Sequence, residues 1–375
     1  MKNKIMSLSK QEWLTFLGVF LITIGDYFCY SWIDVPYRHI FGVPIVVAGT
    51  IILLIDVIKN IKEKVYTPKQ LKTMGIIILV GALVWHRIQV FYTAIVIALH
   101  FVNKDLKFLF KSLFISMLFG MTLIMFLNLI NVIPGRVLTR VKDGEVFYRY
   151  CLGFRQPNVL YRYYIAMVMC GAITLKNNKW FIIIAFILGL VLYKVTYSRM
   201  GLVMLFLLIF VCILPKTFRK KVAFNKLIPY MFIGGLIVSI IVAIAFHNNE
   251  TLNDWLSTRP MIWYEYLKDV GLLGRFRRIQ EDMPLDNIYL HILSYGGIYG
   301  IIAYIALFFV AFNKFDLKNG YNTFMIFFIS LAYGFIENFS AQNENMLLIL
   351  LIVMLLDKNK LAEIEDDYEY EKSPN

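Results

Sequence analysis

Apolar segments alternate with short polar gaps along almost the whole chain. A helix needs about 20 mainly apolar residues to cross a bilayer, and a run of such segments is typical of an integral membrane protein. The pattern therefore predicts an all-α membrane protein of about twelve transmembrane helices. The predicted spans are residues 13–31, 40–58, 73–86, 88–102, 113–133, 160–175, 180–197, 200–214, 227–246, 288–312, 322–340 and 346–357.

Two junctions between predicted spans are very short, at His86-Arg87 and at Ser198-Arg199. Joining either pair of spans into one long helix would reverse the sidedness of every later loop. The lysine-rich loops would then alternate wrongly, so both junctions are predicted to be helical hairpins.

The chain is predicted to form one membrane domain at residues 1–357 with two sizeable outer loops, at about 134–159 and 247–287. No internal repeat is visible. Residues 358–375 are predicted to form an acidic cytoplasmic tail. Within it, Glu363–Glu371 is acidic and poor in apolar residues and is expected to be disordered.

Basic residues divide between the two sets of alternate loops. One set holds 22 lysines and a single arginine, Arg219, whereas the other holds 12 arginines and only Lys142 and Lys268. Lysine and arginine enrichment marks cytoplasmic loops, so the lysine set and both termini are placed in the cytoplasm. Arginine binds phosphate and carboxylate in bidentate fashion, which favours an outer face that holds an anionic substrate. The alternative is that these arginines only contact lipid headgroups or anionic wall polymer.

Composition and motifs further limit the range of possible functions. The chain is 59% hydrophobic, and its net charge of +13 lies largely in the cytoplasmic lysines that topology requires, so no nucleic-acid binding is predicted. The four cysteines form no CxxC pattern, and the inner loops contain no phosphate-cradling glycine motif. We therefore expect no metal and no nucleotide cofactor, and we expect any chemistry in the outer loops.

The second outer loop is predicted to contain a short helix. Ser257 or Thr258 can cap a helix that begins near Pro260. Aromatic residues in this loop are typical of a helix at the membrane interface, and next to acids and arginines they also suit sugar binding. These aromatic residues are Trp255, Trp263, Tyr264 and Tyr266.

Three of the polar residues within or at the ends of predicted spans bear on function. Asp26 is in the middle of the first span, where a charge is costly, so a partner is expected. Glu337 lies near the outer end of the eleventh span. His291 follows Asp286 by about one helical turn and can share its face.

Four motifs occur in order between residues 152 and 300. They are Leu152-Gly153-Phe154-Arg155-Gln156-Pro157-Asn158, Tyr197-Ser198-Arg199-Met200-Gly201, Ser257-Thr258-Arg259 with Trp263, and Leu285-Asp286-Asn287-Ile288-Tyr289-Leu290 with Gly296-Gly297-Ile298-Tyr299-Gly300. In this order they resemble the bacterial Wzy-type polysaccharide polymerases and the related O-antigen ligases, although Gln156 stands where relatives often have histidine.

The resemblance implies a GT-C-like membrane glycosyltransferase that acts on the extracytoplasmic face of the bacterial cell membrane. It would polymerise undecaprenyl-pyrophosphate-linked oligosaccharide repeat units into capsular polysaccharide, exopolysaccharide or O-antigen, with the lipid pyrophosphate as leaving group. The implied partners are this lipid-linked oligosaccharide and the lipid bilayer, with a flippase and a chain-length regulator as further candidates. Asp286-Asn287 stands where ligases have His-Asn, which favours a polymerase.

The implied site residues are arginines for the departing pyrophosphate and an acid or histidine for the acceptor hydroxyl. Asp286 is the first choice of base, with Glu337 and His291 as alternatives, and Arg199 and Arg259 are the catalytic cations. The predicted substrate-binding residues are Arg155, Asn158, Arg162, Arg275, Arg277 and Arg278.

Two other functions compete with the polymerase. One is an O-antigen-type ligase that transfers finished glycan to another acceptor. The other is a lipid-linked glycan flippase or transporter without chemistry, a class that tends to show internal repeats and ionisable groups at mid-membrane. Only Asp26 lies clearly there, which favours the enzyme.

Overall fold

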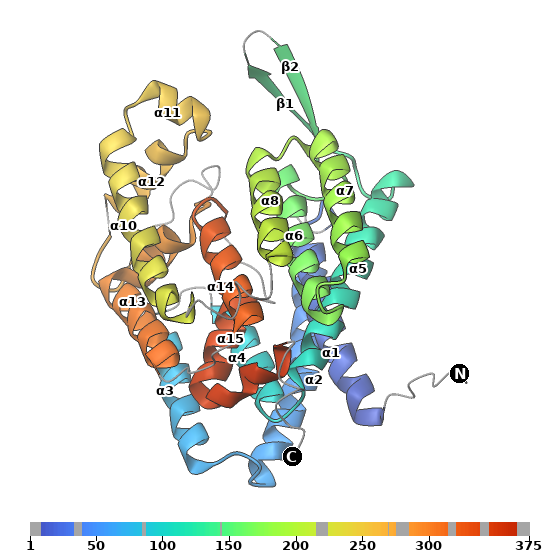
Figure 1. Cartoon of the computed structure of the whole chain (residues 1–375), viewed down its shortest axis with the longest axis vertical. Coiled ribbons are helices and arrows are strands. Elements are labelled where there is room, and N and C mark those ends of the chain that lie inside the picture. Colours follow the sequence, from blue (N-terminus) through green and yellow to red (C-terminus); the bar gives the residue numbers. More distant parts are fainter. Residues whose placement is uncertain are drawn as a thin grey trace. The chain divides into compact units, whose positions relative to one another are not determined.

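A computed structural model gives the fold of the chain (Figure 1). It describes residues 9–33, 40–84, 88–142, 145–214, 224–268, 270–274, 285–313, 320–337 and 345–365. The chain divides into two compact units, and the division falls inside two of its helices, α4 and α8. Unit 1 comprises Met1–Tyr66 and Val96–Leu205, and unit 2 comprises Thr67–Ile95 and Phe206–Asn375.

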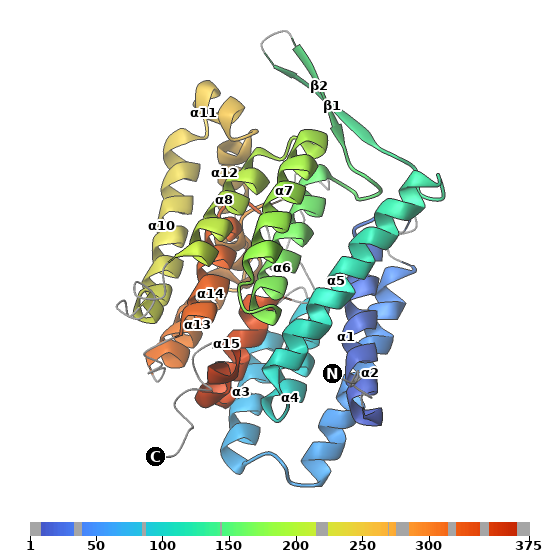
Figure 2. The ribbon, with the colours of Figure 1, turned by 45° about the vertical axis from the view of Figure 1, so that its right-hand side comes forward.

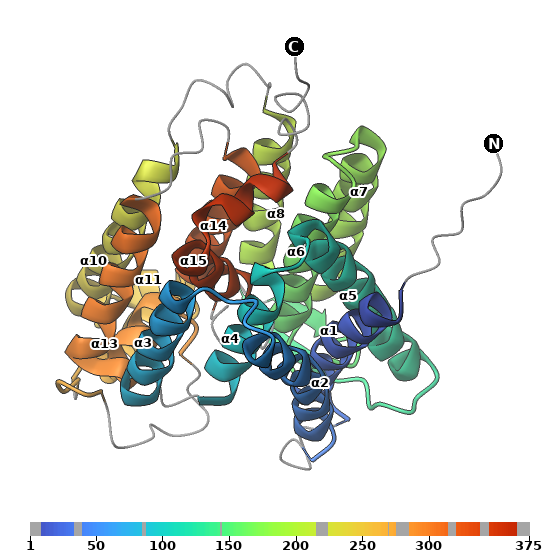
Figure 3. The ribbon, with the colours of Figure 1, turned by 90° about the horizontal axis from the view of Figure 1, so that it is seen from below.

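Unit 1 consists of helices and one β-hairpin. Within it, α1 and α2 lie side by side and α5 runs along α1, as Figures 2 and 3 show. The elements of unit 1 are α1 (Lys10–Cys29), α2 (Gly42–Lys62), the end of α4 (Ile88–Val102), α5 (Leu106–Leu129), β1 (Val137–Lys142), β2 (Glu145–Tyr150), α6 (Pro157–Thr174), α7 (Lys179–Thr196) and the start of α8 (Arg199–Ile213).

Glycines allow α1 and α2 to approach each other closely. A Cβ atom at Gly49 would lie 2.6 Å from the carbonyl oxygen of Gly18, and one at Gly25 would lie 2.7 Å from that of Gly42. Both obstacles are backbone atoms, which cannot swing aside as a side chain can. Small residues at helix contacts are typical of membrane proteins, where association depends on close packing rather than on a hydrophobic drive.

Asp26 has a hydrogen-bonding partner, as its place in the middle of a predicted span led us to expect. The Tyr163 hydroxyl on α6 donates a hydrogen bond to Asp26 Oδ2 at 2.5 Å, and Asp26 is fully buried. The rings of Tyr27 and Tyr163 lie 4.0 Å apart beside this bond. The contact joins α1 to α6 in the interior of unit 1.

The turn before α6 is tied to the end of α1. Leu152 and Gly153 have left-handed backbone, with φ of 48° and 87°. The amide of Trp32 donates to the Gly153 carbonyl oxygen at 2.9 Å, and that of Arg155 donates to Tyr30 at 2.8 Å. Part of the first motif therefore has a structural role, because only glycine adopts such a conformation without cost.

Unit 2 is built from helices packed around α10 and α13. In it, α10 contacts α12, α13 and α14. The elements are α3 (Pro68–Val84), the start of α4, the end of α8, η2 (Phe224–Leu227), α10 (Ile228–Phe246), α11 (Glu250–Trp255), α12 (Arg259–Leu267), α13 (Ile288–Asn313), α14 (Tyr321–Gly334), α15 (Met346–Leu356) and η4 (Lys358–Ile364).

The helix α13 is broken at Gly297, where φ is 66° and ψ is −165°. The amides of Ile298 and Tyr299 donate instead to the carbonyl oxygens of Gly271 and Leu272, at 3.3 and 3.1 Å. Backbone groups released by a break in an apolar helix need such partners, because lipid offers none. The chain after α12 therefore stabilises the second half of α13.

The start of the acidic tail is ordered, so the expectation of disorder for Glu363–Glu371 is wrong for residues 363–365. The 3-10 helix η4 runs from Lys358 to Ile364, and Glu365 accepts hydrogen bonds from the amides of Asn322 and Thr323 at 2.9 and 3.0 Å. A carboxylate at a helix N-terminus satisfies free amides and complements the helix dipole. Residues 366–375 lie outside the described part of the chain.

A helix lies in each of the twelve predicted ranges. Six of these helices are long and apolar enough to cross a membrane, namely α1, α2, α5, α7, α10 and α13, and α4, α8, α14 and α15 are shorter apolar helices. The chain is therefore a mostly helical membrane protein. The turn between α7 and α8 is as tight as predicted, whereas His86-Arg87 lies outside the described residues.

The all-α prediction is incomplete in the first outer loop. This loop contains the antiparallel strands β1 and β2, in which Val137 pairs with Tyr150 and Lys142 pairs with Glu145. The following helix α6 begins at Pro157 rather than at residue 160. Proline is favoured at the first helical position because it has no amide to leave unpaired there.

Candidate active site

The guanidinium group of Arg259 lies beside two carboxylates in unit 2. Arg259 Nη2 is 3.2 Å from Glu337 Oε1 and 3.7 Å from Asp286 Oδ2. Arg259 Nη1 also donates to the carbonyl oxygen of Leu256 at 3.3 Å. The three charged residues come from the start of α12, the segment before α13 and the segment after α14. Folding thus brings together three of the predicted catalytic residues.

The two carboxylates differ in exposure. The side chain of Glu337 is 4% exposed, whereas that of Asp286 is 27% exposed. A buried carboxylate paired with arginine fixes the orientation of the guanidinium plane. A carboxylate that water can reach is also open to a substrate hydroxyl. The geometry therefore favours Glu337 as the residue that positions Arg259, and Asp286 as the group that exchanges a proton.

Two buried donors on α12 have no acceptor in the part of the chain that the structure describes. They are Arg259 Nε and Trp263 Nε1, four residues apart and so on one face of the helix. Buried polar groups in proteins nearly always have a hydrogen-bonding partner. A substrate oxygen, above all a charged one, would complete both donors.

Asn287 fixes the position of its neighbour Asp286. The Asn287 side chain is fully buried, and its Nδ2 donates to Ser239 Oγ at 3.0 Å and to the Phe335 carbonyl oxygen at 2.9 Å. Its Oδ1 accepts from the amide of Leu290 at 2.9 Å and so caps α13. The predicted site residues did not include Asn287, although its place in the Leu285–Leu290 motif was a signal.

The third candidate base, His291, lies in the first half of α13, and its side chain is buried. It is 4% exposed, and its ring lies 4.5 Å from that of Tyr295. Its amide donates to the carbonyl oxygen of Asn287 at 2.9 Å, which places it one turn further along the helix. Such packing favours a structural role and leaves Asp286 as the better candidate base.

A second polar group lies in unit 1 at the start of α6. Asn158 Oδ1 accepts hydrogen bonds from Ser198 Oγ at 3.1 Å and from Arg149 Nη2 at 2.8 Å. Arg149 Nε also donates to the carbonyl oxygen of Thr196 at 3.1 Å. The first and second motifs therefore meet in space. Arg149 joins them from β2, and nothing but its place in an outer loop singled it out in the sequence.

The other predicted arginines of unit 1 differ in accessibility. Arg155 and Arg199 are exposed and are open to an anion. Arg162 is only 4% exposed, and its guanidinium carbon lies 5.1 Å from the ring centre of Tyr30 and 5.6 Å from that of Tyr163. Cation–π contacts in the interior favour a structural role for Arg162.

The predicted cap of α12 is wrong. The helix begins at Arg259, close to the predicted start, but Thr258 Oγ1 donates to the carbonyl oxygen of Ser257 instead of capping the helix. Ser257 and Thr258 both have left-handed backbone, with φ of 57° and 62°. Left-handed residues other than glycine carry strain, and strain of this kind clusters at functional sites.

The aromatic residues predicted to lie at the membrane interface also differ in exposure. Trp263 and Tyr266 are buried, and the Trp263 ring packs edge-on against Phe335 at 5.4 Å. Trp255 is 73% exposed, and its place at a membrane interface stays a prediction. Trp263 therefore offers its indole N–H rather than a ring face for stacking on a sugar.

The remaining predicted arginines, Arg275, Arg277 and Arg278, lie outside the described residues, so their binding role stays a prediction. Within the described ranges, no group of three or more histidine, cysteine, aspartate or glutamate side chains could hold a metal ion.

No family model, curated protein or solved structure matches the chain. The function therefore rests on the motifs and on the geometry of the site.

Proposed function

We propose that this protein is a polysaccharide polymerase of the Wzy type, a GT-C-like glycosyltransferase with twelve membrane crossings. Its termini lie in the cytoplasm and its site lies on the extracytoplasmic face of a bacterial cell membrane. Its substrates are oligosaccharide repeat units carried on undecaprenyl pyrophosphate. The motif order and the arginine-rich outer loops support this assignment.

The observation that carries the proposal is the setting of Arg259. Its side chain is only 11% exposed, is held by Glu337, and retains Nε without an acceptor among the described residues. A cation preorganised in a low-dielectric site stabilises developing negative charge more strongly than one that must first be ordered. Trp263 Nε1 adds a second donor on the same helical face. This is the chemistry that a departing pyrophosphate requires.

The proposed reaction is a glycosyl transfer. A hydroxyl oxygen of the acceptor sugar forms a bond to the anomeric carbon of the donor, and the bond from that carbon to the pyrophosphate oxygen breaks. The hydroxyl proton passes to the Asp286 carboxylate, which is the more exposed of the two acids. The leaving pyrophosphate takes the bonding electrons, and Arg259 neutralises its charge.

The test uses purified protein in nanodiscs with the repeat unit of its own host on undecaprenyl pyrophosphate and no nucleotide. A gel ladder of glycan lengths is expected. Asp286→Asn is expected to lower the rate by about 10² to 10⁴, the usual contribution of a positioned base. Arg259→Lys is expected to lower it by about 10² to 10³, since lysine lacks the planar donor set.

The matched control is Glu265→Gln on α12, which removes an exposed acid paired with Lys268 at 2.6 Å. This variant is expected to give the ladder of the wild type. If Asp286→Asn and Arg259→Lys also give full ladders, the assigned roles are wrong. If the folded wild type gives no ladder from intact substrate, the polymerase is excluded, and the next assay is transfer of glycan to a different acceptor.

A further inference from the structure

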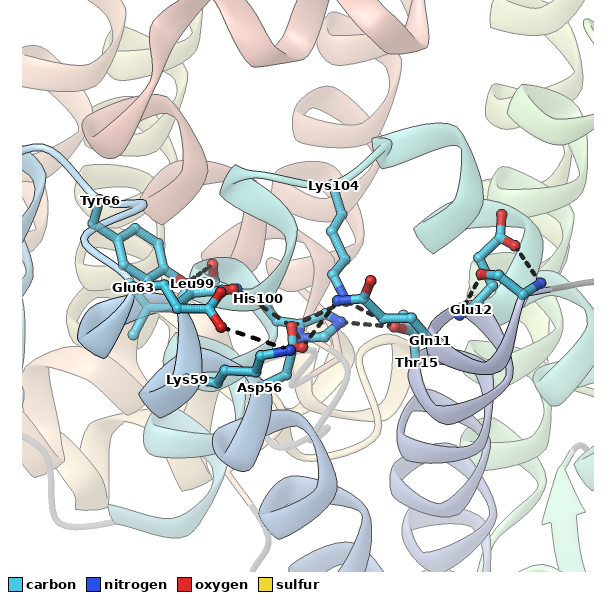
Figure 4. A network of polar contacts seen from close by, with 12 residues as sticks. Gln11, Glu12, Thr15, Asp56, Lys59, Glu63, Tyr66, Leu99, His100 and Lys104 are labelled. Carbon is cyan, nitrogen blue, oxygen red and sulfur yellow. Dashed lines mark hydrogen bonds and ion pairs between the residues drawn. The ribbon is translucent and has the colours of Figure 1, made fainter.

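Polar side chains from α1, α2 and the end of α4 meet in unit 1, as Figure 4 shows. The Asp56 carboxylate on α2 is the centre of this group. It accepts from Gln11 Nε2 at 3.1 Å, from Asn60 Nδ2 at 3.3 Å and from Lys104 Nζ at 3.0 Å. Lys104 lies two residues beyond the end of α4, so one carboxylate on α2 binds both α1 and the segment after α4.

His100 connects to the same carboxylate from the last turn of α4. His100 Nδ1 lies 3.1 Å from Asp56 Oδ2, and His100 Nε2 lies 3.0 Å from Thr15 Oγ1. Lys104 Nζ also donates to Thr15 Oγ1 at 3.1 Å. His100 is 1% exposed, so water has almost no access to its ring.

The charges of this group balance only while His100 is neutral. Asp56 carries one negative charge and Lys104 one positive charge, which cancel at 3.0 Å. Because Thr15 Oγ1 accepts a hydrogen bond from Lys104 Nζ, the Thr15 hydroxyl can donate its own proton to an unprotonated His100 Nε2. A proton on His100 would remove this bond and add a second, uncompensated positive charge to a buried site, which is costly.

Four other charged groups on the neighbouring elements have partners of their own. Glu12 on α1 accepts from the amide of Ser9 at 2.7 Å, and Lys59 pairs with Glu63 on the outer face of α2 at 3.7 Å. Asp105, beyond Lys104, caps α5 through the amide of Lys107 at 2.8 Å. The charged groups in direct contact with His100 and its partner Thr15 are Asp56 and Lys104.

We propose that Asp56, His100, Lys104 and Thr15 form a pH-sensitive junction, in which protonation of His100 weakens the contact of α1, α2 and α4. The site is independent of the proposed glycosyl transfer. By the predicted topology it lies on the cytoplasmic side, so acidification of the cytoplasm is the signal that it would read. Histidine suits this task because a free imidazole takes up a proton between about pH 8 and pH 5, which the buried ring resists, so the unfolded chain is favoured at low pH.

The test measures the thermal unfolding midpoint of the full chain in nanodiscs at about pH 7.5 and at about pH 5, on either side of the ordinary histidine pKa of about 6.5. The wild type is expected to lose stability at the lower pH. His100→Gln keeps a neutral polar side chain at this position. Its unfolding midpoint is therefore expected to fall much less between the two pH values than that of the wild type. His247→Gln is the control, since His247 lies in unit 2, where its ring bonds the Ile244 carbonyl oxygen and stacks on Tyr264.

A second pair of variants decides the sign of the effect. Lys104→Met leaves the Asp56 carboxylate without its lysine, so a protonated His100 then supplies the missing charge. The drop at low pH is expected to vanish or reverse in Lys104→Met, and to persist in the surface control Lys59→Met. The proposal is overturned if His100→Gln keeps the wild-type drop. Should His100→Gln fail to fold, an unchanged drop in Lys104→Met overturns it equally.

Discussion

Arg259 and Glu337 lie 78 residues apart in the sequence, yet their side chains meet at 3.2 Å in the interior of unit 2. The pair joins the start of α12 to the segment after α14. Both groups are almost fully shielded from water, so each depends on the other for its charge to be tolerated.

The first prediction concerns the stability of this pair. Glu337→Met leaves the Arg259 charge buried with only the longer contact to Asp286, and is expected to lower the free energy of unfolding by about 3–5 kcal/mol. The double variant Arg259→Met with Glu337→Met removes both charges and is expected to lose less. Denaturant unfolding in detergent measures the difference, and additive losses in the double variant would contradict the coupling.

The second prediction concerns the contact of α1 and α2. Gly49→Ala places a methyl group 2.6 Å from the Gly18 carbonyl oxygen, so the helices must separate. We expect a loss of about 1–3 kcal/mol, the usual cost of overpacking. Gly75→Ala is the matched control, because nothing lies within 4 Å of a Cβ there. This control is expected to be neutral or stabilising by up to about 1 kcal/mol, since alanine favours a helix. Equal effects of the two substitutions would show that the close approach does not exist.

The third prediction concerns Arg149 in the β-hairpin. Its two nitrogens reach Asn158 and Thr196 at once, which lysine cannot do. If the group at the start of α6 serves the proposed reaction, Arg149→Lys is expected to shorten the glycan ladder while the unfolding midpoint falls by only a few degrees. Glu145→Gln in the same strand, an exposed position, should leave the ladder unchanged. A full ladder from Arg149→Lys would assign Arg149 a purely structural role.

The fourth prediction concerns the thiol of Cys151, which lies between β2 and α6. Burial raises the pKa of Cys151 to about 11, although Arg136 and Arg149 act in the opposite direction. The thiolate is the reactive form, so alkylation by iodoacetamide is expected to be very slow at neutral pH and to accelerate as pH rises towards 11. Thr139→Cys, at an exposed position of the hairpin, supplies the reactive comparison.

The raised pKa of Cys151 also determines how the stability of the protein changes with pH. Because the folded state holds the Cys151 proton more tightly than the unfolded state, unfolding becomes more favourable as pH rises above the unfolded thiol pKa of about 8.5. Cys151→Ser is expected to flatten this alkaline decline. A wild-type protein that labels as fast as Thr139→Cys at neutral pH would show that the Cys151 thiol is accessible.

The helices were predictable because lipid imposes a strong rule on the sequence. A spanning segment must be apolar and must satisfy its own backbone, so hydropathy alone located a helix in each of the twelve ranges. The β-hairpin was missed for the opposite reason. Its strands are six residues each and mix polar with apolar side chains, which gives a weak signal in an outer loop.

The sequence by itself determined which segments are helical and which residues are rare enough to draw attention, among them Asp26, Arg259 and Asp286. Tertiary structure alone decided which of them meet. Glu337 rather than Asp286 is the buried partner of Arg259, and Arg149 rather than Arg162 reaches Asn158. Hydropathy is a local property of a segment, whereas an ion pair or a closed donor set depends on the angles at which distant helices pack. That packing is decided by side-chain shape and glycine contacts across the whole unit.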